Sequence, residues 1–89
     1  MKPFKLFPSQ SFLEELDGWR RHDPKIAARI ARLIEDIARD PYQGIGKPEH
    51  LKYFQANLWS RRITEEHRLV YLVEQEKITL LQCRYHYWR

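Results

Sequence analysis

Cysteine, glycine and long apolar runs are scarce in this chain of 89 residues. The single cysteine, Cys83, can form no internal disulfide and has no second thiol with which to bind zinc, which favours a reducing compartment. No stretch approaches the roughly 18 apolar residues that cross a bilayer, and the first residues lack the apolar segment of a signal peptide. We therefore expect a cytoplasmic protein that does not enter a membrane.

What the chain does contain is typical of a folded domain. Hydrophobic residues make up 43% and charged residues 31%, which excludes a disordered composition and, at this length, predicts a single domain over residues 1–89. The net charge is +4, and residues 47–89 carry eight basic against five acidic side chains, a net +3. A polyanion such as nucleic acid would be attracted to that half of the chain, although charge alone is weak evidence.

The first half predicts a short strand and two helices. Residues 2–7 alternate as a brief or edge strand between two prolines. Ser11 followed by Glu14 is typical of a capping box that opens a first helix, and Gly18 suggests that this helix is short or frays. Asp23 and Pro24 predict the start of a second helix, with apolar residues at helical spacing opposite a charged face that includes Asp36.

The second half predicts a loop and a sheet. Residues 41–49 contain two prolines and two glycines, so we expect an irregular loop, whose Lys47 and Glu49, with nearby Lys52, are candidates for function. Residues 58–64, 68–73 and 78–85 then alternate as three strands joined by short turns, which requires antiparallel pairing. The order predicts an α+β fold: an N-terminal strand, a two-helix hairpin, and an antiparallel sheet with the helices packed on one face.

Alternation within the strands distributes the basic residues between two faces. One side of residues 58–64 carries Ser60, Arg62 and Thr64, and the other carries Trp59, Arg61 and Ile63. Arg68 shares a side with Val70 and Leu72 in the next strand, and Arg84 shares one with His86 in the last. Arginines on neighbouring strands can form a concave cationic surface, and scattered surface charges are the alternative interpretation.

Glu49, Arg68 and His86 supply the groups needed for RNA cleavage without a metal. A carboxylate can take the 2′-hydroxyl proton, a guanidinium can stabilise charge on the phosphorane, and an imidazole can protonate the leaving 5′-oxygen. The histidines lack metal-ligand spacing, the serines lack a nucleophile elbow, and the short GIGK run does not follow a strand. We expect neither a metal nor a cofactor.

Three blocks in order, GKPEHLK at 46–52, WSRRITEEHRLVY at 59–71 and CRYHY at 83–87, closely resemble the YoeB toxins of the RelE/ParE superfamily, which belong to type II toxin-antitoxin systems. The resemblance covers essentially the whole chain. It implies the RelE-like microbial RNase fold and a ribosome-dependent endoribonuclease that cuts messenger RNA in the ribosomal A site. It also implies a cognate antitoxin of the YefM type, and it leaves a homodimer open.

Carried over by position, the resemblance assigns the general base to Glu49, the phosphate-stabilising arginine to Arg68 and the general acid to His86. It assigns RNA binding to three further residues, Lys52, Arg62 and Tyr87. Two departures stand out. His50 lies where relatives often have proline, which predicts a less rigid loop, and the chain continues past Tyr87 into Trp88 and Arg89.

Two other functions stay open at this point. The first is a non-enzymatic toxin of the same superfamily that inhibits DNA gyrase, against which the presence of Glu49 and His86 argues. The second is a plain module that binds RNA or protein through its basic sheet.

Overall fold

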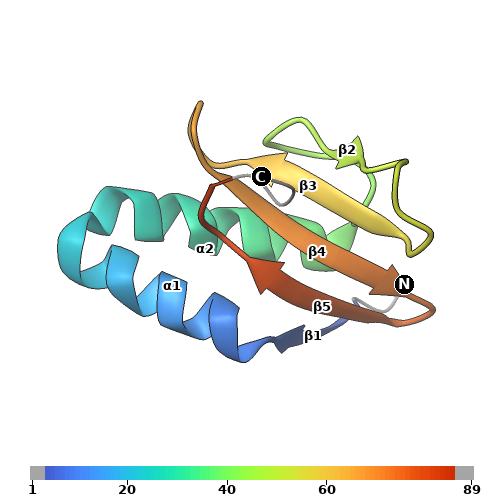
Figure 1. Ribbon diagram of the computed structural model, residues 1–89, viewed down its shortest axis with the longest axis horizontal. Helices are drawn as coiled ribbons and strands as arrows, with labels where there is room; N and C mark the ends of the chain where they lie inside the picture. Colours follow the sequence, from blue (N-terminus) through green and yellow to red (C-terminus); the bar gives the residue numbers. More distant parts are fainter. Residues whose placement is uncertain (1–3, 86–89) are drawn as a thin grey trace.

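The computed structural model of the chain describes residues 4–85, with five strands and two helices in that range. In chain order they are β1 (Lys5–Pro8), α1 (Gln10–His22), α2 (Pro24–Arg39), β2 (Glu49–His50), β3 (Leu58–Arg62), β4 (Arg68–Glu74) and β5 (Lys77–Gln82) (Figure 1). The predicted α+β class is confirmed. Within residues 4–85, no helix is long and apolar enough to span a bilayer.

The strands form one mixed sheet in the order β1-β5-β4-β3-β2. The three predicted strands of the second half pair antiparallel, as expected. Two features were not predicted. β1 is an edge strand, but it pairs parallel with β5, and the predicted loop over residues 41–49 ends in the two-residue strand β2, which pairs antiparallel with β3 at the opposite edge.

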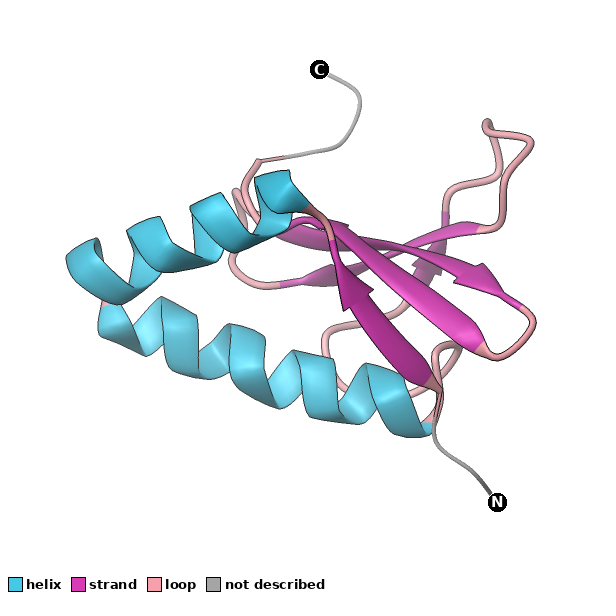
Figure 2. Cartoon of the chain, turned by 90° about the horizontal axis from the view of Figure 1, so that it is seen from below, coloured by secondary structure: helices cyan, strands magenta, loops and turns pink. Residues whose placement is uncertain are grey.

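Both helices lie on one face of the sheet (Figure 2). α2 begins at Pro24 and ends before Pro41, as its sequence predicted, and it buries Ile30, Leu33 and Ile37 against the strands. Each such side chain contributes about 1.5–3 kcal/mol when fully buried. The core between the layers also holds Cys83, which is fully buried.

Details of the helix ends differ from the prediction. The N-cap of α1 is Ser9 rather than Ser11, and its Oγ accepts a hydrogen bond from the Phe12 amide at 3.1 Å. The same hydroxyl donates to the Leu81 carbonyl at 3.0 Å, which ties the helix start to β5. α1 continues through Gly18 to His22, so this helix does not end early.

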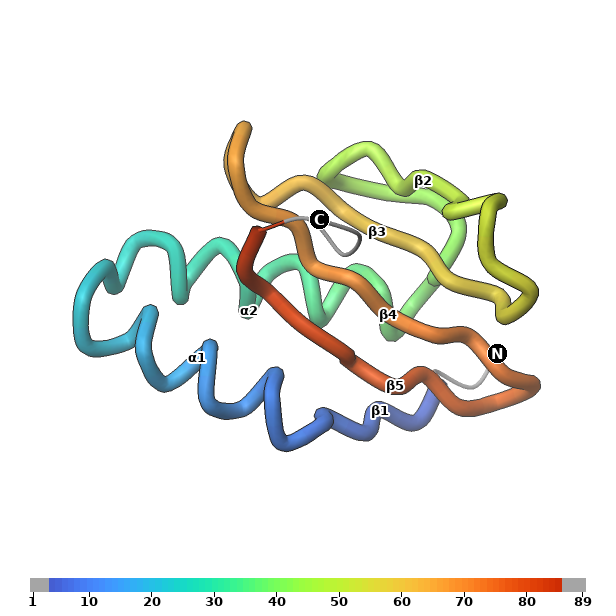
Figure 3. Tube along the Cα trace, viewed as in Figure 1, coloured from blue at the N-terminus to red at the C-terminus, as the bar shows by residue number. Residues whose placement is uncertain are grey.

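The face of the sheet opposite the helices is only partly covered. The segment that connects β2 to β3 runs along the β2 edge of the sheet (Figure 3). A small cluster of Leu51, Leu58 and Val70 packs on this face. The remaining part of that face carries Ser60, Arg62 and the start of β4, because alternate side chains of a strand point to the same side. Ser60, Arg62 and Arg68 therefore lie on the face of the sheet that the helices leave open.

Candidate functional site

Glu49 and Arg68 meet on the open face of the sheet. The pairing of β2 with β3 sets Glu49 opposite Ser60, and Arg68 begins the next strand. Arg68 Nη1 lies 3.2 Å from Glu49 Oε1 and 3.2 Å from Ser60 Oγ. The arginine side chain is 16% exposed and the glutamate side chain is 60% exposed. A preorganised guanidinium and an accessible carboxylate therefore stand side by side.

A second arginine lies directly across from the first. Arg62 of β3 is the cross-strand partner of Arg68, so both side chains project from the same face. Like charges in that arrangement destabilise a sheet unless an anion lies between them. Glu49 neutralises Arg68, but no carboxylate within residues 4–85 forms an ion pair with Arg62. Arginines of two neighbouring strands therefore share the open face, as predicted, and Arg62 is exposed there.

Arg61, the residue before Arg62 in β3, is buried, whereas a strand arginine is usually exposed to solvent. It points to the helix side and is fully buried. Its guanidinium donates to the Asp36 carboxylate at 2.6 Å and to three carbonyls of the loop after α2, those of Asp40, Gln43 and Ile45. Because that loop leads directly to β2, Arg61 fixes the segment that delivers Glu49.

Asp36, on the predicted charged face of α2, belongs to this network. Its side chain is 17% exposed. Burial acts to raise the pKa of Asp36, but hydrogen bonds from Arg61, the Ile45 amide and Arg39, with the charge of Arg61, outweigh it and hold this pKa below its usual value. The network is therefore an ionised carboxylate locked to a buried guanidinium. Asp36 does lie opposite the buried apolar residues of α2, as predicted, but the sequence did not predict its contact with Arg61.

The chain is clamped just before the proposed acid. The Tyr85 amide donates to His67 Nδ1 at 2.8 Å, and the Arg68 amide donates to the Tyr85 carbonyl at 3.2 Å. His67 is buried, with its ring edge-on to Trp19. Residue 85 is thereby fixed beside the backbone of Arg68. His86 and Tyr87 lie outside the described residues, so their predicted roles stay predictions.

Lys52 lies beside a groove at the β2 edge. Pro48 to Tyr53 line it with Tyr42 and Trp59, and its volume is about 750 Å³. Lys52 is exposed there. The His50 imidazole stacks on the Trp59 indole, with ring centroids 5.0 Å apart and planes 16° from parallel. The departure from proline at this position therefore adds an aromatic contact.

Three roles were missed by reasoning from the sequence. The sequence predicted that Ser60 shares a strand face with Arg62, but it did not predict that the Ser60 hydroxyl accepts a hydrogen bond from Arg68. It also did not predict that His67 accepts the Tyr85 amide proton, or that Arg61, on the face opposite Arg62, is buried against Asp36. The one available signal was that strand alternation sets Arg61 on the same side as Trp59 and Ile63. Within residues 4–85, no three His, Cys, Asp or Glu side chains form a group that could hold a metal.

Comparison with known proteins identifies the class first. The family described as the YoeB-like toxin of bacterial type II toxin-antitoxin systems matches residues 7–87. The chain is thus a toxin of that class of systems. Toxin YoeB of Escherichia coli strain K12 is 46% identical over 83 residues, which cover 93% of this chain and 99% of the relative. The chain belongs to the YoeB-like toxin family, and the resemblance found in the sequence is confirmed.

Solved structures agree. A YoeB/ParE toxin from Agrobacterium tumefaciens superimposes with a TM-score of 0.87 at 42% identity, covering 93% of this chain and 99% of that one. YoeB from Staphylococcus aureus was solved as a dimer and in a heterotetrameric complex with YefM. The dimer has a TM-score of 0.83 at 37% identity and covers 96% of this chain and 99% of that one. The complex has a TM-score of 0.82 at 38% identity and covers 94% of this chain and 98% of that one.

Proposed function

We propose that this chain is a ribosome-dependent messenger RNA endoribonuclease that acts in the cytoplasm and inhibits translation. The observation that carries the proposal is the contact of Glu49 with Arg68 on an open cationic face, in a chain of the YoeB-like family. A carboxylate beside a phosphate-binding guanidinium is the arrangement that cleavage by the 2′-hydroxyl needs. A plain binding surface would need no carboxylate at its centre.

In this mechanism the RNA supplies its own nucleophile. Glu49 accepts the 2′-hydroxyl proton, and the 2′-oxygen forms a bond to the adjacent phosphorus. Arg68 and Arg62 stabilise the charge that develops on the phosphorane. The bond from phosphorus to the 5′-oxygen breaks as His86 donates a proton to that oxygen. The products are a 2′,3′-cyclic phosphate, which can open to a 3′-phosphate, and a free 5′-hydroxyl.

Substrate positioning falls to the remaining assigned residues. Lys52 would neutralise a flanking phosphate, and Tyr87 would contact the RNA close to His86. Ser60 holds the Arg68 side chain in the ground state. When a phosphate arrives, Arg68 can shift its second hydrogen bond from Glu49 to the phosphate, which frees the carboxylate to act as base. This exchange explains why an ion pair can occupy the site before substrate binds.

Two protein partners follow from the relatives. S. aureus YoeB was solved with YefM and as a dimer, and we propose a YefM-like antitoxin and a homodimer for this chain as well. The cationic face is the surface that an antitoxin would have to cover in order to block the reaction.

The test uses growth inhibition together with mapping of transcript 5′ ends after expression. Glu49→Gln should lower cleavage about 10²- to 10⁴-fold, the usual contribution of a general base. Arg68→Lys should also be inactive, because an ammonium lacks the planar fork. Glu74→Gln is the matched control, since Glu74 is also an exposed glutamate in an ion pair on this sheet. It should cleave like the wild type.

A folded Glu49→Gln variant that retains full toxicity would remove Glu49 as the base. Toxicity accompanied by loss of DNA supercoiling, with intact transcripts, would instead identify a gyrase inhibitor.

A further inference from the structure

The groove beside Glu49 has the features of a binding site for an unstacked nucleobase. We infer that His50, Trp59 and Tyr53 form a stacking subsite for a base of single-stranded RNA on the 5′ side of the cut. The inference rests on the proposed function, and it assigns to that activity a base-binding site and a determinant of sequence preference.

The aromatic wall of the groove is held rigid. Trp59 Nε1 donates to Asn57 Oδ1 at 2.9 Å, and Asn57 Nδ2 donates to the Tyr42 hydroxyl at 3.3 Å. Tyr42 packs against Trp59 with centroids 4.9 Å apart. His50 is exposed whereas Trp59 is half-buried, so the imidazole is the outer ring of the stack. Stacking of a nucleobase requires an exposed face on a ring that is held in place, and the His50 imidazole offers one. Any of the four bases can stack there, because each has a π-face.

The exposure of Tyr53 is a second observation that supports a base-binding subsite. Its side chain is 95% exposed, the largest value among the exposed large hydrophobic residues of the described chain. It lines the groove with Lys52, an exposed cation. Aromatic rings interleaved with a cation are typical of surfaces that bind single strands, because the rings stack on bases and the cation neutralises a phosphate. The volume, about 750 Å³, lies within the range of small-ligand pockets.

The place of the groove beside Glu49 indicates that it binds the RNA on the 5′ side of the cut. Glu49 takes the proton from the ribose immediately upstream of the scissile phosphate. Glu49 contacts Arg68 and also lines the groove, whereas Arg68 does not line it. His50 follows Glu49 on β2, so its side chain points to the opposite face of the strand. RNA that continues upstream from Glu49 therefore passes over the outer edge of β2 into the groove. The next upstream base is the one that reaches His50.

An antitoxin strand is the competing occupant, and the geometry disfavours it. Adding a strand to a sheet relies on a row of free backbone groups along the edge. β2 offers an edge only two residues long. Its neighbours, Lys47 and Lys52, are both exposed cations, which suits a phosphate backbone.

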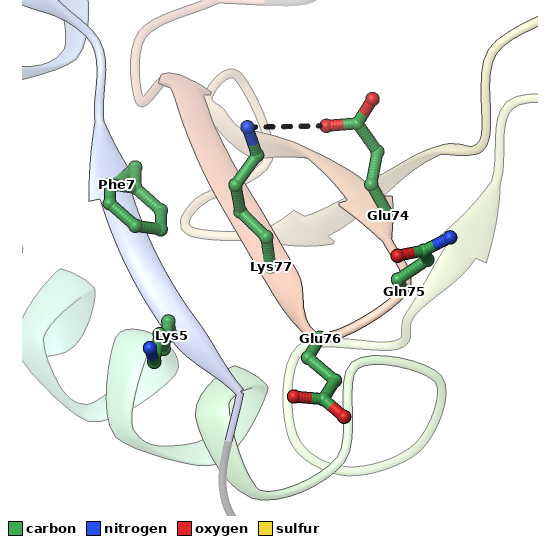
Figure 4. Close-up of a pocket in the computed structure, with 6 residues that line it drawn as sticks. All are labelled: Lys5, Phe7, Glu74, Gln75, Glu76 and Lys77. Carbon is green, nitrogen blue, oxygen red and sulfur yellow. Dashed lines mark ion pairs between the residues drawn. The ribbon is translucent and has the colours of Figure 1, made fainter.

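The chain offers a matched control surface at the opposite edge of the sheet. Phe7 of β1 is 47% exposed and lies 5.6 Å from Lys77 Nζ, which is paired with Glu74 at 3.8 Å (Figure 4). This surface also combines an exposed ring with a lysine, but it lies away from Glu49. Phe7→Ala is therefore the control for Tyr53→Ala.

The experiment measures binding of the full chain to a short 2′-O-methyl RNA, which cannot be cleaved. A purine at the second position upstream of the cut is compared with an abasic residue there. We expect the purine to bind more tightly, and His50→Ala and Tyr53→Ala each to remove about 5- to 100-fold of that preference. Phe7→Ala should bind as the wild type does. In cleavage of ribosome-bound message, the same two variants should lose the base preference at that position.

Equal binding of the purine and abasic RNAs by the wild type would overturn the subsite. So would His50→Ala and Tyr53→Ala variants that weaken only the binding of a YefM-type antitoxin. Failure of the proposed function is separate: the wild type would then cleave nothing, while the binding measurement would still decide whether the groove holds a base.

Discussion

Replacing Arg61 by methionine tests the network that delivers Glu49. The buried guanidinium makes five hydrogen bonds, including one from Nε to the Tyr71 hydroxyl at 3.1 Å. Methionine fills a similar volume but leaves the Asp36 carboxylate without its closest donor. Removing one partner of a buried pair costs about 3–5 kcal/mol, and we expect the lower end, about 3 kcal/mol, because Asp36 keeps hydrogen bonds from Ile45 and Arg39.

Urea unfolding followed by circular dichroism measures this loss, and the melting temperature should fall by about 12–24 °C. Arg62→Met is the control, because Arg62 is exposed on the same strand and its loss should change stability by no more than about 0.5 kcal/mol. A loss below about 1 kcal/mol for Arg61→Met would refute the reasoning.

The same variant should alter the response to acid. The pKa of Asp36 is lowered in the folded protein, so its contribution to stability is complete above the ordinary carboxyl pKa of about 3.9. That contribution is lost as the pH falls through the lower folded value. In Arg61→Met this part of the acid-induced loss of stability should shrink, and the two unfolding curves should converge at low pH. Parallel curves throughout the acid range would contradict the assignment.

Four further outcomes are expected. Gly44→Ala should destabilise by about 1–3 kcal/mol in urea unfolding, because its φ is +134° and an added Cβ would clash with an aspartate of α2. Gly18→Ala, in open space within α1, should instead stabilise by about 0.5–1 kcal/mol. His67→Phe should speed hydrogen exchange of the Tyr85 amide about 3- to 10-fold, because the amide loses its acceptor; unchanged exchange would exclude the clamp. Burial and a nearby glutamate raise the pKa of Cys83 to about 12, so a thiol reagent at about pH 8 should label only the unfolded chain.

The sequence predicted the residue types of the site but not the contacts between residues that are far apart in the chain. The residue types and the blocks around Glu49 and Arg68 could be recognised in order, and the structure brings these two together. They are 19 positions apart in the chain, and they meet because β2 pairs with β3 and β3 pairs with β4. The two residues of β2 are too few to show a periodic pattern in the sequence. The groove beside them could not be foreseen, because it arises from the stacking of His50 on Trp59.

The sequence by itself determined the elements whose signals are local. The apolar spacing between Pro24 and Pro41 is enough for α2, since proline sets both ends. Short runs rich in apolar and β-branched residues, separated by polar turns, are enough for β3, β4 and β5. Only the tertiary structure decided the parallel pairing of β1, the choice of Ser9 as a cap and the burial of Arg61. Each of these depends on groups distant in the chain, such as the carbonyl of Leu81 and the carboxylate of Asp36. A local pattern carries no information about partners that the folded chain alone brings within hydrogen-bonding distance.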